Sequence, residues 1–135
     1  MNACILDAGA IIALLSGEKG ASVVDDILTE NIGYCYIHAA NLCEVYYGIF
    51  RAHSREYALS ALEAIYSLGI QSRKDLDADF WQDAGQIKAI YRRVSLADCY
   101  GLALTRRMNG EFITTDRHEL TVIQSAALCP IRFVS

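Results

Sequence analysis

Short runs of hydrophobic residues alternate along this chain with longer segments in which hydrophobic residues recur at helical spacing. The short runs suit buried strands, and the longer segments suit helices that pack against a sheet. The pattern predicts strands at 3–6, 33–37, 69–72, 111–115 and 130–134, and helices at 8–15, 21–30, 38–50, 55–68, 80–92, 96–108 and 117–127, the last as a short helix or an irregular turn. Alternating strands and helices favour a mostly parallel sheet covered on both faces, so the predicted fold class is α/β, a three-layer α/β/α sandwich.

The segment from 95 to 116 carries the most chemical information. Ser95 and Asp98 have the spacing of a helix-capping box, and Asp116 directly follows the predicted strand 111–115. As a cap alone, Asp98 would be an ordinary structural residue, and Asp116 alone would be an ordinary turn residue. Asp98, however, lies on a mostly apolar face of its helix. A charge there is costly to bury unless it is paired or bound to a metal.

Two further carboxylates follow predicted strands. Asp7 comes directly after the first strand, where its alternative role is to cap the next helix, and Glu44 shares a helix face with Asn41. Because the carboxyl ends of parallel strands meet at one edge of a sheet, we expect these acids to gather there with Asp98 and Asp116. Two carboxylates ~5 Å apart repel by about 3 kcal/mol at an effective dielectric of about 20. Such a cluster therefore favours a hard divalent cation, Mg²⁺ or Mn²⁺.

Composition narrows the class of protein. At 135 residues, with 53% hydrophobic residues and one proline, the sequence predicts a single folded domain (1–135) rather than a disordered chain. The net charge of −4 argues against a broad basic surface for nucleic acid, so any such binding would be local. The five cysteines form no C-x-x-C pair and no secretory leader is recognisable, which predicts free thiols and a cytoplasmic location. The longest nearly apolar run, 8–15, is too short to cross a bilayer, so we expect no membrane association.

Four segments carry a family resemblance: ILDAGAIIALL around Asp7, NLCEVYYG around Glu44, SLADCYGLALTRR around Asp98 and FITTD ending at Asp116. Together they resemble the four motifs of the PIN-domain family, and more narrowly those of its VapC-type ribonuclease toxins, over essentially the whole chain. The resemblance implies an α/β/α fold and Mg²⁺-dependent endoribonuclease cleavage of RNA, with Mn²⁺ as an alternative metal. It also implies that the four acids are catalytic and that Asp7 and Asp98 are metal ligands.

The resemblance further implies partners and supporting residues. The expected partners are a second copy of the chain and a cognate antitoxin that blocks the site, and Asn41 and Thr115 are expected to support the acids. The predicted helix 55–68 carries more hydrophobic residues than one core contact needs. We expect that surplus, with Tyr46 or Tyr47, to form the homodimer interface.

Five basic residues lie close to Asp98 in sequence and are predicted to neutralise RNA phosphates: Lys88, Arg92, Arg93, Arg106 and Arg107. The alternative is that these residues lie at helix ends and are exposed to solvent without binding RNA.

Two features depart from the family pattern. Members often have Ser or Thr two residues after the first aspartate, whereas this chain has Gly9, so a hydroxyl that could orient Asp7 or a metal-bound water is missing. Residues 117–120, Arg-His-Glu-Leu, also agree less well with the acidic and aromatic residues that usually follow the fourth motif. Neither departure removes an acid, so activity is still expected.

The competing function is a non-catalytic PIN-like module that binds RNA or protein without cutting. Loss of one or more acids would indicate that function, and all four are present. A response-regulator-like phosphoacceptor domain is set aside because it needs an acidic pair near the N-terminus, whereas Asp7 is a single acid. A nucleotide-binding glycine loop is not supported, because the chain contains neither GxxxxGKS nor GxGxxG.

Overall fold

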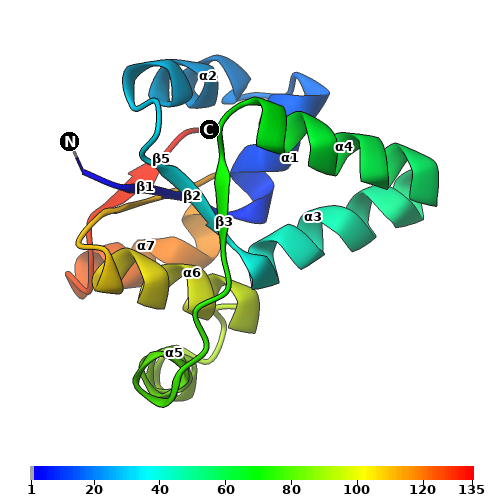
Figure 1. Cartoon of the computed structure of the whole chain (residues 1–135). Helices are drawn as coiled ribbons and strands as arrows, with labels where there is room; N and C mark the ends of the chain where they lie inside the picture. Colours follow the sequence, from blue (N-terminus) through cyan, green and yellow to red (C-terminus); the bar gives the residue numbers. More distant parts are fainter. Residues whose placement is uncertain (1) are drawn as a thin grey trace.

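The computed structural model describes residues 2–135 and contains the predicted alternation of strands and helices (Figure 1). The strands are β1 (Cys4–Leu6), β2 (Cys35–His38), β3 (Gln71–Arg73), β4 (Glu111–Thr114) and β5 (Ile131–Phe133). The helices are α1 (Ala8–Ser16), α2 (Ala21–Glu30), α3 (Ala39–Ala52), α4 (Arg55–Ser67), α5 (Ala78–Ile90), α6 (Leu96–Arg107) and α7 (Arg117–Ser125). Each boundary lies within two residues of the predicted one. Within residues 2–135, no helix is both long and apolar enough to cross a membrane.

The five strands run parallel in the order β3-β2-β1-β4-β5, which confirms the predicted α/β/α sandwich. Side chains alternate between the two faces of the sheet. On one face Leu6, Ile37 and Ile113 pack against α1 to α4, and on the other Ile5 and Phe112 pack against α5 to α7. In Figure 1 the helices α5, α6 and α7 accordingly lie together below the sheet.

The connections diverge at the centre of the sheet, between β1 and β4. The chain leaves β1 toward β2 on one side and leaves β4 toward β5 on the other. Leu6 is in register with Ile113, and the Asp7 N–H donates to the Ile113 carbonyl at 3.0 Å. Open α/β sheets bind ligands at such a switch point, outside the carboxyl ends of the strands. Here the switch point brings Asp7 beside the residues that follow β4.

Three helices begin at the predicted side-chain caps. Asp7, Ser54 and Ser95 each accept a hydrogen bond from the backbone N–H three residues ahead, at 2.8, 3.1 and 3.1 Å. Each cap satisfies an N–H that the first helical turn leaves unpaired. The segment after Asp116, predicted as either a helix or an irregular turn, is the helix α7.

Two helix boundaries differ from prediction for a local reason. His38 was predicted to open a helix but ends β2, because its Nδ1 accepts the Ala40 N–H at 3.0 Å and caps α3. Helix α5 was predicted to reach Arg92 but ends at Ile90. Lys88 Nζ donates to two carbonyl oxygens of the turn that follows α5, at 2.7 and 2.8 Å, and so stabilises that turn.

Candidate active site

A recess of about 530 Å³ opens at the switch point, at the carboxyl ends of β1 and β4. All four predicted acids line it, together with one acid that was not predicted. The lining residues are Asp7, Ala8, Gly9, Glu44, Ser95, Asp98, Thr115, Asp116 and Glu119. Five of these nine carry a carboxylate, and this described lining contains no basic side chain. The recess is therefore strongly acidic and has no countercharge in its wall.

Asp7 is the most deeply buried of these acids, with 3% of its surface exposed. Its Oδ1 accepts the Ala10 N–H at 2.8 Å, and its Oδ2 accepts the Thr114 hydroxyl at 2.5 Å. The pKa of Asp7 is raised to about 6, chiefly by burial and also by the charges of Asp116 and Glu44, while the two hydrogen bonds oppose the rise. Asp7 is thus both a helix cap and one of the acids that line the recess.

Asp98 lies in the first turn of α6 and is 8% exposed. Burial raises its pKa to about 8, and the charges of Asp7, Glu44 and Glu119 act in the same direction. A hydrogen bond with the Ser95 side chain opposes the rise. A carboxyl with such a pKa is mostly protonated at neutral pH, because burial without nearby positive charge disfavours its ionised form.

Glu44 reaches the recess from α3 and is half-buried. Burial and the charge of Glu119 raise the pKa of Glu44, and a long 3.4 Å hydrogen bond from the Tyr47 hydroxyl opposes the rise. Asn41, one turn earlier on α3, is fully buried and donates from Nδ2 to the Ala97 carbonyl at 3.1 Å. This bond joins α3 to the first turn of α6, so Asn41 helps to fix Glu44 relative to Asp98.

Glu119 is the acid of the recess that was not predicted from the sequence. Asp98, Asp116 and Glu119 each offer a carboxylate oxygen within 4.8 Å of the others. Asp116 caps α7 by accepting the Glu119 N–H at 2.9 Å, and burial followed by the Asp116 charge raises the pKa of Glu119. The spacing of Asp116 and Glu119 repeats the spacing of Ser95 and Asp98. This second capping-box spacing is the sequence signal from which Glu119 could have been predicted.

The three-residue cluster of Asp98, Asp116 and Glu119 fits a hard divalent cation. Its donors are all oxygens, which Mg²⁺ and Mn²⁺ prefer, and the cluster contains no Cys or His that would favour zinc. Asp7, predicted as a ligand together with Asp98, lines the same recess but lies outside this cluster. Both Asp7 oxygens already accept hydrogen bonds from the protein.

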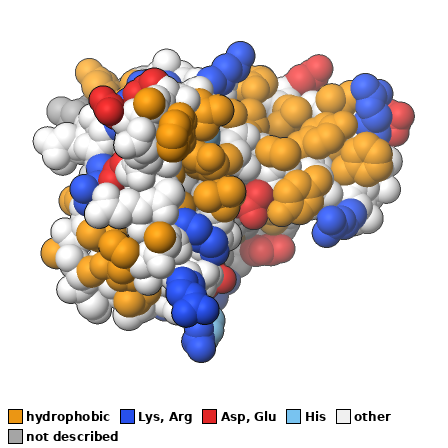
Figure 2. Space-filling view, turned by 90° about the horizontal axis from the view of Figure 1, so that it is seen from below, with side chains coloured by type: hydrophobic (Ala, Val, Ile, Leu, Met, Phe, Trp, Pro, Cys, Tyr) orange, Lys and Arg blue, Asp and Glu red, His pale blue; other side chains and the backbone are white. Residues whose placement is uncertain are grey.

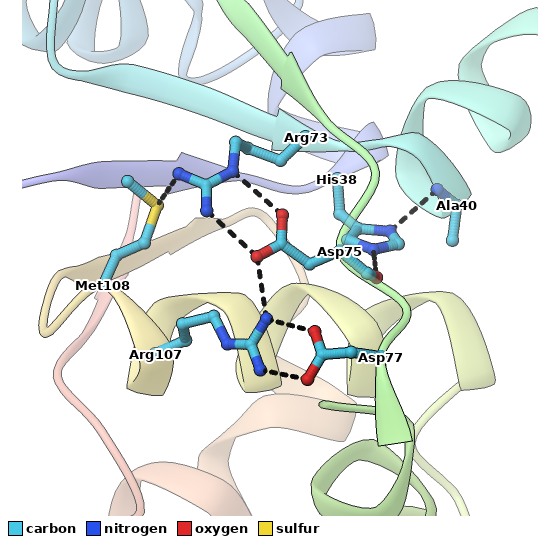
Figure 3. A network of polar contacts seen from close by, with 7 residues as sticks. All are labelled: His38, Ala40, Arg73, Asp75, Asp77, Arg107 and Met108. Atoms are coloured by element: carbon cyan, nitrogen blue, oxygen red, sulfur yellow. Dashed lines mark hydrogen bonds and ion pairs between the residues drawn. The ribbon is translucent and has the colours of Figure 1, made fainter. Parts of the chain in front are cut away.

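Three of the five basic residues predicted to bind RNA contact other protein groups. Lys88 donates to the backbone carbonyls described above, and Arg106 pairs with Asp83 at 3.2 Å. The third is Arg107, which belongs to an ion-pair network between α6 and the connector that follows β3 (Figure 3). None of these three side chains lines the acidic recess.

The network in Figure 3 surrounds two aspartates with two arginines. Arg107 makes two hydrogen bonds to Asp77, at 2.6 and 2.8 Å, and one to Asp75 at 3.1 Å, while Arg73 makes two to Asp75 at 2.9 Å. The Arg107 hydrogen bonds lower the pKa of Asp77 to about 2, and chiefly the Arg73 hydrogen bonds lower the pKa of Asp75. Asp77 is also the N-cap residue of α5, and Asp79 lies in the first turn of that helix.

Arg92 and Arg93 differ from the other three basic residues. No ion pair joins either arginine to an acid within residues 2–135. Both line a second recess of about 630 Å³ between the α5–α6 turn and α7. Glu119 lines both recesses, so the two adjoin.

The sequence model of the PIN domain family matches residues 4–123. DNA-bound VapBC from Salmonella typhimurium has a TM-score of 0.74 at 18% identity over 100% of both chains. VapBC2 from Rickettsia felis, bound to a DNA fragment from its promoter, has a TM-score of 0.73 at 13% identity over 98% of both chains. VapC20 from Mycobacterium tuberculosis, a toxin that cleaves the sarcin-ricin loop, has a TM-score of 0.69 at 15% identity over 89% of this chain and 95% of its own. No curated protein matches the sequence.

Proposed function

This chain belongs to the PIN domain family, and on that premise we propose that it is a divalent-metal-dependent endoribonuclease that hydrolyses phosphodiester bonds of RNA. One observation carries the proposal. Five carboxylates meet in one recess without a countercharge in its wall, and three of them present oxygens within 4.8 Å of one another. The raised pKa values of Asp7 and Asp98 are the expected consequence of that missing charge.

Each acid has a distinct role in the proposal. Asp98, Asp116 and Glu119 hold Mg²⁺ or Mn²⁺, and Asp7 adds its charge from a position fixed by two hydrogen bonds. When bound, such an ion supplies Lewis acidity toward the phosphodiester and the attacking water. Glu44, whose one hydrogen bond is 3.4 Å long, is the acid left most able to accept a proton from that water.

The direct test is cleavage of a single-stranded RNA by the purified protein with Mg²⁺, with Mn²⁺ and with EDTA. We expect internal cleavage with either metal and none with EDTA. Asp7→Ala, Glu44→Ala and Asp98→Ala should each abolish it. RNA binding without cleavage would identify the protein as a binding module, and cleavage that persists in EDTA would exclude the metal mechanism.

RNA approaches the acids along the second recess in this proposal. Arg92 and Arg93 are free to contact phosphates there, directly beside Glu119, whereas the guanidinium of Arg106 already pairs with Asp83. Loss of two phosphate contacts should flatten the dependence of log affinity on log salt by roughly 1.4 for a single strand.

The test uses catalytically inactive Asp98→Asn protein, so that binding is measured without cleavage. The double variant Arg92→Ala with Arg93→Ala should show a smaller dependence of log affinity on log salt. Arg106→Ala is the matched control, because Arg106 already pairs with Asp83 of the same chain. A slope unchanged by the double substitution would remove these arginines from the RNA surface.

We also propose a toxin role, with a cognate antitoxin as partner. The Salmonella and Rickettsia structures that share this fold are VapBC pairs. A segment that covers an all-acid recess must bring positive charge, so the antitoxin should insert a basic residue among these carboxylates. A co-expressed antitoxin should suppress cleavage, and Asp98→Asn with Glu119→Gln should weaken its binding.

The proposed homodimer uses the hydrophobic side chains exposed along both edges of α4. Hydrophobic side chains gather where α3 and α4 project from the rest of the molecule (Figure 2). On α4 and its end the exposed ones are Tyr57, Leu59, Tyr66 and Leu68, and on α3 they are Tyr47 and Phe50. Light scattering should give twice the chain mass of 14.9 kDa, and Tyr57→Glu with Tyr66→Glu should return it to the monomer. A wild-type monomer at micromolar concentration would contradict the dimer.

A further inference from the structure

Two side-chain hydroxyls line the acidic recess, those of Ser95 and Thr115. The Ser95 hydroxyl is engaged, because it accepts the Asp98 N–H at 3.1 Å and also bonds to the Asp98 carboxylate. Within residues 2–135, only the backbone carbonyl of Thr115 takes part in a hydrogen bond, from the Ser135 hydroxyl at 3.0 Å. The Thr115 hydroxyl is therefore an unengaged neutral donor in a wall of carboxylates.

Gly9, the second residue of α1, leaves the space that this hydroxyl occupies. A Cβ at position 9 would collide with Thr115 Oγ1 and would lie 3.6 Å from Asp7 Oδ1. The backbone does not require glycine, since Gly9 has an ordinary helical conformation and the positive-φ glycines lie elsewhere. Glycine weakens a helix relative to alanine, so space is the physical reason for its presence here. The hydroxyl that Gly9 lacks is thus supplied at the same point by a residue from the end of β4.

We propose that the Thr115 hydroxyl donates a hydrogen bond to the scissile phosphodiester of the RNA, and that Gly9 is small in order to admit it. This inference rests on the proposed endoribonuclease function. Phosphodiester oxygens only accept hydrogen bonds, and carboxylates repel them, so contacts in the recess must come from donors or from a metal. Thr115 lies between Thr114, which holds Asp7, and Asp116 of the metal cluster. A donor at this point meets the phosphate where the acids act on it.

The first test separates the hydroxyl from the shape of the side chain. Thr115→Val removes the donor at nearly constant volume, and Thr115→Ser retains it. We expect Thr115→Val to lower kcat for RNA cleavage about 10-fold or more, and Thr115→Ser to recover most of that loss. Both variants should keep the Mg²⁺-induced rise in melting temperature, because all five carboxylates remain.

The second test exchanges the two positions. Gly9→Ala should lower kcat as Thr115→Val does, because the added methyl displaces the hydroxyl. Gly9→Ser combined with Thr115→Ala should be faster than either single substitution, because it returns a hydroxyl to the same point. Gly85→Ala is the matched control, since Gly85 is also a helical glycine but faces open space. It should leave kcat unchanged and raise the melting temperature slightly.

The outcomes keep this inference separate from the proposed function. Wild-type kcat in Thr115→Val would overturn the role of the hydroxyl while leaving the endoribonuclease intact. Equal losses of kcat and of Mg²⁺ stabilisation in Thr115→Val and Thr115→Ser would also overturn it, because they would assign Thr115 to packing. Failure of the wild type to cleave RNA with Mg²⁺ would instead overturn the proposed function.

Discussion

Aspartates gather in two places in this molecule, and the two groups differ in what balances their charge. In the network of Figure 3, Asp77 faces Arg107 through two hydrogen bonds, and its pKa is lowered to about 2. In the acidic recess, Asp98 is buried among other carboxylates, and its pKa is raised to about 8. An aspartate side chain is thus ionised easily in the network and with difficulty in the recess.

The contrast separates structural charge from functional charge. The network aspartates are neutralised by arginines of the same chain, so they need nothing from outside. The carboxylates of the recess have no basic side chain beside them in the described lining, so the protein does not neutralise their charge. A buried group left in that condition is a candidate for binding an external cation, and perturbed pKa values cluster at functional sites for this reason. Substitutions in one group, with the matching substitution in the other group as control, test this distinction.

The largest expected effect is on cleavage. Asp98→Asn should lower RNA cleavage by at least about 100-fold, the scale on which one charge-stabilising group acts. Asp77→Asn should leave cleavage within about two-fold, because Asp77 contacts Arg107 away from the recess. The measurement is the initial rate on one RNA at saturating Mg²⁺. Equal losses in the two variants would erase the distinction between the groups.

Metal binding should stabilise the protein through the recess alone. At 100 times its Kd, a bound ion adds about 2.7 kcal/mol by mass action. That corresponds to roughly 10 °C in the melting temperature of a domain of this size. We expect this rise with Mg²⁺ in the wild type and in Asp77→Asn, and much less in Glu119→Gln, which lacks one of the three clustered carboxylates. A full rise in Glu119→Gln would remove Glu119 from the metal cluster.

The metal-free protein should become less stable as the pH rises from 5 to 8.5. The folded-state pKa values of Asp7 and Asp98 are about 6 and about 8, above their ordinary value of 3.8. Between about pH 4 and 8 the folded state therefore holds protons that the unfolded state has released, so stability falls with rising pH. Asp77 has the opposite shift, and its contribution is lost only in acid.

Melting curves in EDTA at pH 5, 7 and 8.5 measure this slope. Asp98→Asn should flatten it and should melt a few degrees above the wild type at pH 8.5, because the costly charge is gone. A wild-type melting temperature that stays level, or rises, across this range would contradict the charge deficit in the recess.

The smallest expected effect comes from the network. Arg107→Gln should lower the melting temperature by no more than a few degrees, because exposed ion pairs stabilise weakly. It should leave the salt dependence of RNA binding unchanged, since its partners are Asp75 and Asp77. A flatter salt slope in Arg107→Gln would return this arginine to the RNA surface predicted from the sequence.

The fold and the position of the recess were predictable because their signals are local. Alternating hydrophobic runs place the strands, and Asp7 and Asp116 each follow a strand directly, so a parallel sheet must bring them to one edge. Glu119 was missed because its position depends on whether 117–127 is helical. Only as the third residue of α7 does it meet Asp98 and Asp116.

The pairing of basic residues could not be predicted for a different reason. Arg107 and Asp77 lie 30 residues apart, and their contact depends on how α6 packs near the start of α5. No periodicity in the sequence encodes that distance. The space at Gly9 is similar, because it is defined by a side chain that reaches it from the other end of the chain.

The hydrogen bond between Thr114 and Asp7 joins residues 107 positions apart, and this separation bears on how the protein is made. During translation Asp7, Glu44 and Asp98 are all synthesised before β4, the strand that pairs with β1 and on which the recess depends. Contacts so distant in sequence form only after most of the chain is present, because loop closure must precede them. A partly synthesised chain therefore carries most of its acids without an assembled recess. For the proposed endoribonuclease, this order of synthesis means that the recess cannot assemble beside the messenger and the ribosome until β4 has been added.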